Sequence, residues 1–172
     1  QFKFMNWIRK LAPKIKAILG GKKSLEIPEN SWIKCSQCQT MLYSHDLEKN
    51  YNICPNCDLH LYIHPRMRMK YLFDEGEFEE IAYPTVQLDP LNFKDTNSYK
   101  EKFKKAQVKN NMQDAFLIGY GKIKGISSTV VGMNFQFMGG SLSSAGAEAM
   151  VKAAEHSITF NTPFIVITSS GG

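Results

Sequence analysis

The chain has 172 residues, of which 43% are hydrophobic and 22% are charged, which is enough for one packed core and a small additional module. The formal net charge of +5 comes from the first 25 residues, which contain seven basic and no acidic side chains. The rest of the chain has a slight acidic excess, which argues against a folded body that coats nucleic acid. No apolar run approaches the roughly 20 residues of a membrane span, and no secretory signal is evident, so we expect a reducing, cytoplasmic compartment.

Residues 1–30 are predicted to form a basic N-terminal arm. Its apolar residues recur at spacings of three or four: Ile8, Leu11, Ile15 and Ile18. This pattern predicts an amphipathic helix that bends at Pro13 and ends at the glycine pair 20–21. We expect the arm to pack on a partner or to fray, with membrane-surface attachment and a targeting peptide as the alternatives.

Residues 31–64 are predicted to form a small domain around the four cysteines of the chain. Two Cys-x2-Cys pairs, separated by 15 residues, supply them: Cys35, Cys38, Cys54 and Cys57. The spacing is typical of a zinc ribbon, in which four thiolates close a tetrahedron around one structural Zn2+ per chain. Two disulfides, a redox pair and an iron centre are the alternatives that the spacing leaves open. His60 and His64 follow closely, but four cysteines already satisfy the ion, so we expect both histidines to be surface or packing residues.

Residues 65–97 are predicted to form a helical connector and linker. A helix is expected over 65–83, and Pro84 and Pro90 mark the linker that follows it. A second amphipathic helix is expected from Ser98 to about residue 110, with a solvated lysine face.

Residues 98–172 are predicted to form the first part of an α/β domain. The β-branched runs 115–122 and 126–134 predict a hairpin around Lys124 and Gly125. An alanine-rich helix over 144–160 and a strand over 164–168 are expected next, with Ser143 or Ser144 as the N-cap. The order strand, strand, helix, strand favours an α/β layer over an all-β barrel.

Two glycine turns are candidates for binding an oxyanion. Gly139-Gly140-Ser141 precedes the predicted helix, and Gly171-Gly172 follows the last predicted strand. Glycines let a ligand oxygen approach the main chain, where amide groups can stabilise an enolate. Either turn alone is more often structural than functional. His156, which has no evident cysteine or serine partner in the sequence, is predicted to be structural rather than a general base.

Five ordered segments carry a resemblance to a known family. They are Trp32-Ile33-Lys34-Cys35 opening the ribbon, Phe73-Asp74-Glu75-Gly76, Asp89-Pro90-Leu91-Asn92-Phe93-Lys94-Asp95, Phe135-Gln136-Phe137-Met138-Gly139-Gly140-Ser141 and Ser170-Gly171-Gly172. From about Trp32 onward the chain resembles the β subunits of the carboxyltransferase component of bacterial and plastid-type acetyl-CoA carboxylase.

This resemblance implies a crotonase-like (ClpP/crotonase) domain of ββα units, truncated here and preceded by the zinc ribbon. The implied reaction transfers a carboxyl group from carboxybiotin on the biotin carboxyl carrier protein to acetyl-CoA, forming malonyl-CoA for fatty acid biosynthesis. The implied partners are a carboxyltransferase α subunit in an α2β2 heterotetramer and biotin carboxylase. The implied compartment is the cytoplasm, or the plastid stroma in a plastid-bearing organism.

The resemblance also assigns roles to the glycine turns. Gly171 and Gly172 match the turn that shapes or donates to the oxyanion site, and Gly139, Gly140 and Ser141 match a turn that we assign to the acyl-CoA site. The family continues beyond Ser-Gly-Gly, so we expect the fragment to be inactive alone. The alternative function is a nucleic-acid-binding or regulatory zinc ribbon, whose basic residues would be Lys34, Lys49, Arg66 and Arg68.

Overall fold

The computed structural model describes residues 31–171 and divides the chain into two units, one ending at Leu59 and one beginning at His60. The predicted helix in the basic arm and Gly172 lie outside the described residues. Within residues 31–171, no helix combines the length and the apolar character that crossing a bilayer requires.

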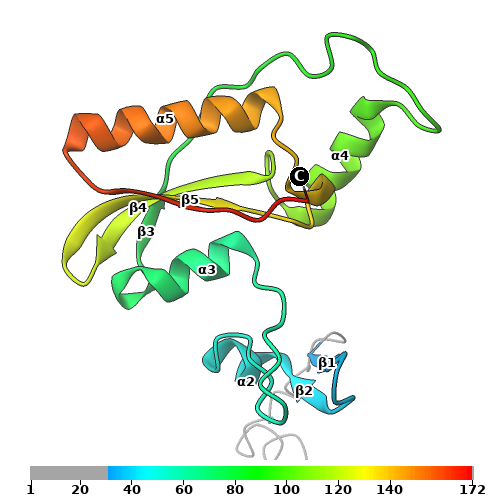
Figure 1. Ribbon diagram of the computed structural model, residues 1–172, viewed down its shortest axis with the longest axis vertical. Helices are drawn as coiled ribbons and strands as arrows, with labels where there is room; N and C mark the ends of the chain where they lie inside the picture. Colours follow the sequence, from blue (N-terminus) through cyan, green and yellow to red (C-terminus); the bar gives the residue numbers. More distant parts are fainter. Residues whose placement is uncertain (1–30, 172) are drawn as a thin grey trace, which may run out of the picture. The chain divides into compact units, whose positions relative to one another are not determined.

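The first unit has a short hairpin and one helix. Strands β1 (Trp32–Lys34) and β2 (Met41–Tyr43) are antiparallel, and helix α2 (Ser44–Lys49) follows directly (Figure 1). Trp32 lies opposite Tyr43 across the hairpin, with ring centroids 5.3 Å apart. Only Leu42, Leu47 and two of the cysteines are fully buried apolar residues in this part of the described chain, too few for a self-sufficient core.

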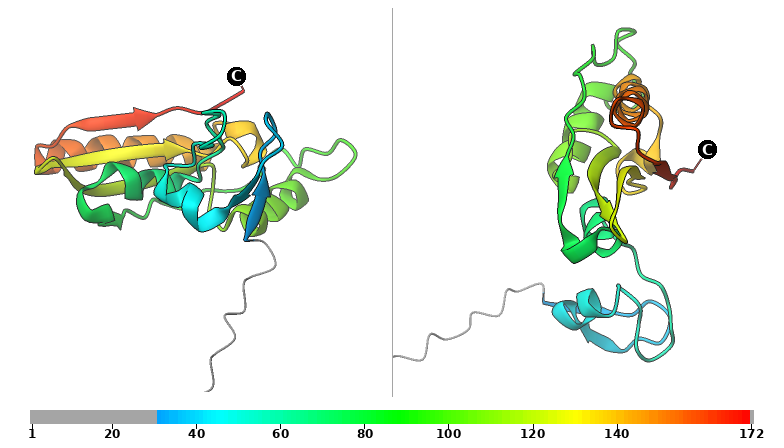
Figure 2. Two further views of the ribbon diagram at one scale, coloured as in Figure 1. Left: turned by 90° about the horizontal axis from the view of Figure 1, so that it is seen from below. Right: turned by 90° about the vertical axis from the view of Figure 1, so that its left-hand side faces the viewer.

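The second unit is built on a four-stranded sheet with the order β3-β4-β5-β6. Its strands are β3 (Phe78–Glu80), β4 (Phe116–Ile123), β5 (Ile126–Met133) and β6 (Phe164–Ile167). The first three pair antiparallel, and β6 pairs parallel to β5 at the edge of the sheet (Figure 2). The predicted hairpin is confirmed: Lys124 and Gly125 both have positive φ, as a two-residue hairpin turn requires.

Helix α5 (Ser144–Phe160) connects β5 to β6 and covers one face of the sheet (Figure 1). It has the predicted bounds, because Ser143 caps its first turn and Asn161 ends it in a left-handed conformation. The helix lies close to the sheet at Gly146, where a Cβ atom would lie 2.4 Å from Phe116 Cε2.

Helix α3 (Pro65–Leu72) packs on the other face of the sheet (Figure 1). Three glycines share this face: Gly119, Gly121 and Gly132. Cβ atoms at these positions would lie 2.8–3.1 Å from Phe73 or Met69. Large side chains from the helix end therefore fill the space that the glycines leave, and Met69 and Phe73 join the hydrophobic core.

The helix predicted over 65–83 is wrong beyond Leu72. The chain leaves helical geometry at Phe73 and makes a short turn, η1 (Asp74–Gly76), with Glu75 and Gly76 at positive φ. The Asp74 carboxylate accepts hydrogen bonds from the backbone N–H groups of Lys124 and Gly125, at 2.8 and 2.7 Å. This ties the turn to the hairpin, so the next residues pair with β4 as strand β3. The segment predicted as a connector thus contributes a strand to the sheet.

Helix α4 (Tyr99–Asn110) confirms the second predicted amphipathic helix. The Ser98 hydroxyl accepts a hydrogen bond from Glu101 N–H, and Asn111 ends the helix in a left-handed conformation. Phe103 is its buried anchor and makes an edge-to-face contact with Phe137, with ring centroids 5.3 Å apart.

Gly146→Ala is expected to destabilise the protein, although alanine is normally more stabilising than glycine in the interior of a helix. The added methyl group would overlap the Phe116 ring, so the free energy of unfolding should fall by about 1–3 kcal/mol. Gly132→Ala is the control, because the closest atom to its Cβ would be the flexible end of Met69 at 3.0 Å, and its cost should be smaller. Urea denaturation measures both, and an equal or smaller loss in Gly146→Ala would contradict this packing.

Candidate functional site

The four cysteines converge in the first unit. Their sulfur atoms all lie within 4.8 Å of one another, with Cys35 Sγ 3.7 Å from Cys57 Sγ and Cys38 Sγ 3.6 Å from Cys54 Sγ. These separations are far longer than the roughly 2.05 Å of a disulfide bond. They match the roughly 3.8 Å between thiolates that surround a tetrahedral ion at about 2.3 Å. The donor set therefore fits one closed, four-coordinate ion.

Each cysteine pair lies in a turn with the same hydrogen bonds. The N–H of Cys35 donates to Thr40 O, and the N–H of Cys54 donates to Leu59 O, both at 2.9 Å. In each turn the residue after the second cysteine, Gln39 or Asp58, has positive φ and donates its N–H to the first cysteine's carbonyl. The two turns thus present their sulfurs to the cluster with the same backbone geometry.

The polar neighbours of Cys38 favour its thiolate form. Side-chain hydrogen bonding by Asn56, followed by that of Thr40, lowers the pKa of Cys38 to about 5, and the thiolate is the form that binds metal. Asn56 Nδ2 also donates to Thr40 Oγ1 across the two turns, at 3.2 Å.

The two nearby histidines are not in the cysteine cluster. His60 is exposed, and His64 caps helix α3 by accepting the N–H of Arg66 at Nδ1 while its Nε2–H donates to Asn110 O. Burial lowers the pKa of His64, in keeping with a neutral ring that donates at one nitrogen and accepts at the other. The prediction that both are surface or packing residues agrees with these positions.

The two glycine turns, whose first residues Gly139 and Gly171 are 32 positions apart in the sequence, lie side by side. The N–H of Gly171 donates to the carbonyl oxygen of Gly139 at 3.0 Å. Gly139 and Gly140 both have positive φ, and a Cβ atom on Gly140 would lie only 2.0 Å from Ser169 O. Only glycine at position 140 allows the two backbones to approach this closely.

The amides of these turns are partly engaged within the protein. Gly140 N–H donates to Phe137 O at 2.9 Å, and Gly171 N–H is used by Gly139. Gly140 is buried, whereas Ser141 and Gly171 are exposed. The second turn therefore exposes backbone at Gly171, and Gly172, the next predicted donor, lies outside the described residues.

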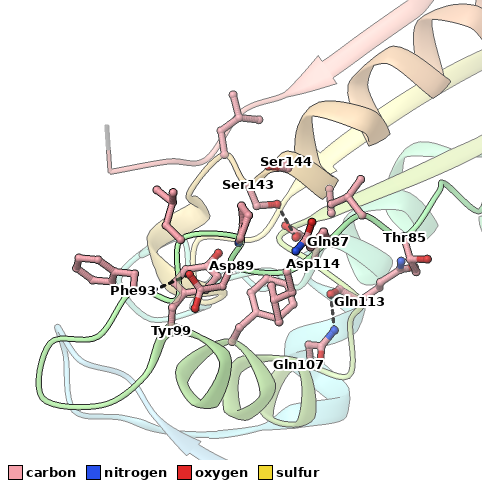
Figure 3. A pocket seen from close by; sticks show the side chains of 17 residues that line it. Thr85, Gln87, Asp89, Phe93, Tyr99, Gln107, Gln113, Asp114, Ser143 and Ser144 are labelled. Carbon is pink, nitrogen blue, oxygen red and sulfur yellow. Dashed lines mark hydrogen bonds between the residues drawn. The ribbon is translucent and has the colours of Figure 1, made fainter.

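A cavity of about 670 Å³ begins immediately after the first glycine turn (Figure 3). Leu142, Ser143 and Ser144 line it at the start of α5, and helix α4 and the loop 85–93 form the other walls. Its surface is mostly apolar, with the amides of Gln87, Gln107 and Gln113 among its polar groups. Sequence reasoning took this loop for a linker. The loop is in fact held in a fixed turn, because Asp89 has positive φ and its carboxylate accepts a hydrogen bond from Phe93 N–H. An aspartate that can form such a turn is the feature of the sequence that could have indicated this.

Asp114 is a buried carboxylate in the wall of this cavity, with 1% of its surface exposed. Ser143 Oγ donates to its Oδ2 at 2.6 Å (Figure 3). Ala115 N–H donates to its Oδ1, also at 2.6 Å. Ser143 Oγ in turn accepts Gly146 N–H and so caps α5. Burial raises the pKa of Asp114, against the opposing effect of these two hydrogen bonds. Sequence reasoning missed this residue, because nothing local distinguishes it from a surface aspartate.

Two other predicted residues have structural partners. Arg66, one of four proposed nucleic-acid contacts, makes a bidentate ion pair with Glu80 and donates to Asn111 O. Its guanidinium is thus used inside the unit. His156 Nδ1 lies 3.0 Å from Thr129 Oγ1, and its ring contacts Tyr120 and Phe160. This packing environment is in keeping with the structural role predicted for it.

Comparison with known families gives two matches in chain order. The acetyl-CoA carboxylase zinc finger domain matches residues 32–57, and the carboxyl transferase domain matches residues 62–172. Among curated proteins, the chain is similar to the acetyl-coenzyme A carboxylase carboxyl transferase subunit beta of Granulibacter bethesdensis, with 37% identity over 98% of the chain. The corresponding protein of Beijerinckia indica is 39% identical over the same share. The chain spans about half the length of these relatives, 54% and 57%.

Solved structures give more distant matches. Transcarboxylase 12S, with methylmalonyl-coenzyme A bound, matches 63% of the chain and 19% of its own, with 22% identity and a TM-score of 0.45. The β subunit of geranyl-CoA carboxylase from P. aeruginosa matches the same shares, with 23% identity and a TM-score of 0.42.

Asp114→Asn is expected to remove a component of the pH dependence of stability. Because the pKa of Asp114 is raised on folding, the folded state holds this proton more tightly, and stability falls as pH rises from 3.8 through the raised pKa. Urea denaturation across this range should show that fall in the parent protein and not in Asp114→Asn.

Asp95→Asn is the control of opposite sign. Lys102 lowers the pKa of Asp95 to about 2, so its contribution is lost as pH falls. Parallel pH profiles for the parent protein and Asp114→Asn would contradict the raised pKa.

Proposed function

The chain belongs to the carboxyl transferase family, and from that premise we propose that it forms part of the β subunit of an acetyl-CoA carboxylase carboxyltransferase. The proposed reaction moves a carboxyl group from carboxybiotin to acetyl-CoA and yields malonyl-CoA. A proton leaves the acetyl methyl group, and the resulting enolate carbon bonds to the carboxyl carbon as the carboxyl–nitrogen bond of biotin breaks. The released biotin nitrogen accepts the proton, so no side-chain base is required.

The observation that carries this proposal is the contact between the two glycine turns. An enolate oxygen needs fixed backbone dipoles rather than an acidic side chain. The hydrogen bond from Gly171 to Gly139 holds two main-chain segments at one edge of the sheet, with no Cβ atom at the closest approach. Such a surface lets a substrate oxygen approach the backbone.

Each glycine turn takes a distinct role in the proposal. Gly171 and Gly172 shape the oxyanion site: Gly171 N–H is engaged by Gly139, which leaves the donor role to the adjacent backbone. Gly139, Gly140 and Ser141 form the wall of the acyl-CoA site. The adjacent cavity supports this side, because its apolar lining and amide groups suit an uncharged portion of the substrate better than a phosphate.

The cysteine cluster is proposed to hold one structural Zn2+ per chain. The ion would be closed by Cys35, Cys38, Cys54 and Cys57, with no position open for water or substrate. Its contribution is to hold together a unit with few buried apolar residues. Cysteines that serve as zinc ligands rather than disulfides suit a reducing compartment, and we place the protein in the cytoplasm on that ground.

The proposed partners follow from the family. They are a carboxyltransferase α subunit in an α2β2 assembly, the biotin carboxyl carrier protein and biotin carboxylase. The alternative of a nucleic-acid-binding ribbon is weaker, because Arg66, one of its four proposed contacts, is paired with Glu80.

Gly140→Ala is expected to lower the rate of carboxyl transfer strongly. In the full-length chain assembled with a carboxyltransferase α subunit, transfer from malonyl-CoA to biocytin should fall by about 100-fold or more, because the new Cβ would displace the Ser169 carbonyl. Gly125→Ala is the matched control, since Gly125 also has a positive φ but a Cβ there would meet open space at the hairpin tip. Inactivity of the folded parent assembly would overturn the proposed function.

Cys54→Ala is expected to release the metal and unfold the first unit. Metal analysis should give about one zinc per chain for the parent protein and none for this variant, because three thiolates cannot close the tetrahedron. Asn56→Ala is the control: it loses the hydrogen bond to Thr40 but keeps all four sulfurs, and should retain the zinc. Full zinc content in Cys54→Ala would contradict the four-cysteine site.

A further inference from the structure

The loop from β5 to α5, residues 134–143, carries the first glycine turn and is held at its first end by Asn134. This residue has none of its surface exposed. Its N–H donates to Ala115 O at 2.7 Å, and its Nδ2 donates to Asn110 Oδ1 at 3.1 Å. Both acceptors belong to the segment that joins α4 to β4, residues 110–115, which we call the α4–β4 junction.

The same junction holds the other end of the loop. Ser143 Oγ donates to Asp114 Oδ2 at 2.6 Å and thereby fixes the residue that caps α5. A buried, ionisable carboxylate is a costly group to keep in a small unit unless its contact is needed. Three residues of the junction, Asn110, Asp114 and Ala115, thus each supply one hydrogen-bond acceptor to the two ends of one loop.

Hydrogen bonds run without a gap from Asn134 to the glycine turn. Asn134 Oδ1 accepts Gln136 N–H at 2.9 Å, and its carbonyl accepts Phe137 N–H at 3.1 Å. The carbonyl of Phe137 then accepts Gly140 N–H at 2.9 Å, while the Phe137 ring is buried against α4. The position of Asn134 therefore determines where the first turn lies.

Asn134 has a second support from outside the loop. The Tyr62 hydroxyl donates to its Oδ1 at 2.6 Å, so this oxygen accepts two hydrogen bonds while Nδ2 donates to the junction. A side chain this fully used has one orientation, and truncating it would leave several buried polar groups unpaired.

We propose that Asn134 and Asp114 are positioning residues, which clamp the two ends of the loop so that Gly139 meets Gly171. Neither side chain is part of the turns themselves. The inference rests on the proposed function only for its effect on catalysis: a small displacement of the loop would separate the two turns and misplace the oxyanion site.

The test compares Asn134→Ala with Asn134→Asp in the full-length chain assembled with its carboxyltransferase α subunit. Asn134→Ala should accelerate hydrogen exchange of the Gly171 amide by about tenfold or more, because the hydrogen bond from Gly171 N–H to Gly139 O would open more often. The same variant should lower kcat by about 10- to 100-fold with the KM for acyl-CoA within about threefold. Asn134→Asp keeps the oxygen that accepts from Gln136 N–H and the Tyr62 hydroxyl but loses the Nδ2 donor to Asn110, so both readouts should recover only in part, to values between those of Asn134→Ala and the parent.

Tyr83→Phe is the matched control, because the Tyr83 hydroxyl also donates one partly buried hydrogen bond, to Phe116 O, but lies outside the clamp. It should alter stability without changing Gly171 exchange. If Asn134→Ala fails to fold, Tyr62→Phe takes its place, since it removes only the hydroxyl of a half-exposed ring. It should change both readouts in the same direction.

The two readouts separate the two hypotheses. Unchanged Gly171 exchange in Asn134→Ala, or in Tyr62→Phe, would overturn the clamp whatever the enzyme catalyses. Faster exchange in an assembly whose parent has no carboxyl transfer would support the clamp and count against the proposed function.

Discussion

The parallel pairing of β5 with β6 is the constraint on which the candidate site depends. In the parallel register, Thr129 lies opposite Phe164 and Gly132 lies opposite Ile167, so the carboxyl ends of the two strands lie next to each other. Residues that follow two neighbouring parallel strands leave side by side, and in this chain those residues are the two glycine turns. Parallel strands need a crossover, which α5 supplies. If β6 were antiparallel to β5, the second turn would lie at the opposite end of the strands from the first.

The two units are stabilised by different interactions. The second unit has a continuous core that extends from Met69 and Phe73 on one face of the sheet to Ala149 and Ala153 on the other. The first unit has few buried apolar side chains and relies on ion coordination. The proposed function needs the rigid unit, since the candidate site consists of backbone groups whose positions depend on packing and on buried polar contacts beneath them.

Much of the fold could be predicted from local signals. The helix over 144–160 has a serine cap and an asparagine stop, the hairpin has its glycine turn, and five ordered segments identified the family, which the comparisons confirm. The error at 73–83 arose because pairing with β4 overrides a helical periodicity. The contact between Gly139 and Gly171, the cavity beside it and the roles of Asn134 and Asp114 all depend on residues distant in sequence, which no local pattern encodes.

The short span of the four cysteines, early in the chain, bears on when the first unit can fold during synthesis. All four ligands lie within residues 35–57, and closing so short a loop costs little chain entropy. This segment leaves the ribosome before any strand of the four-stranded sheet, whose first strand begins at Phe78. The ribbon can therefore capture its ion and fold while the rest of the chain is still being made. A zinc ion available during translation would thus let this unit fold before the sheet of the second unit is complete.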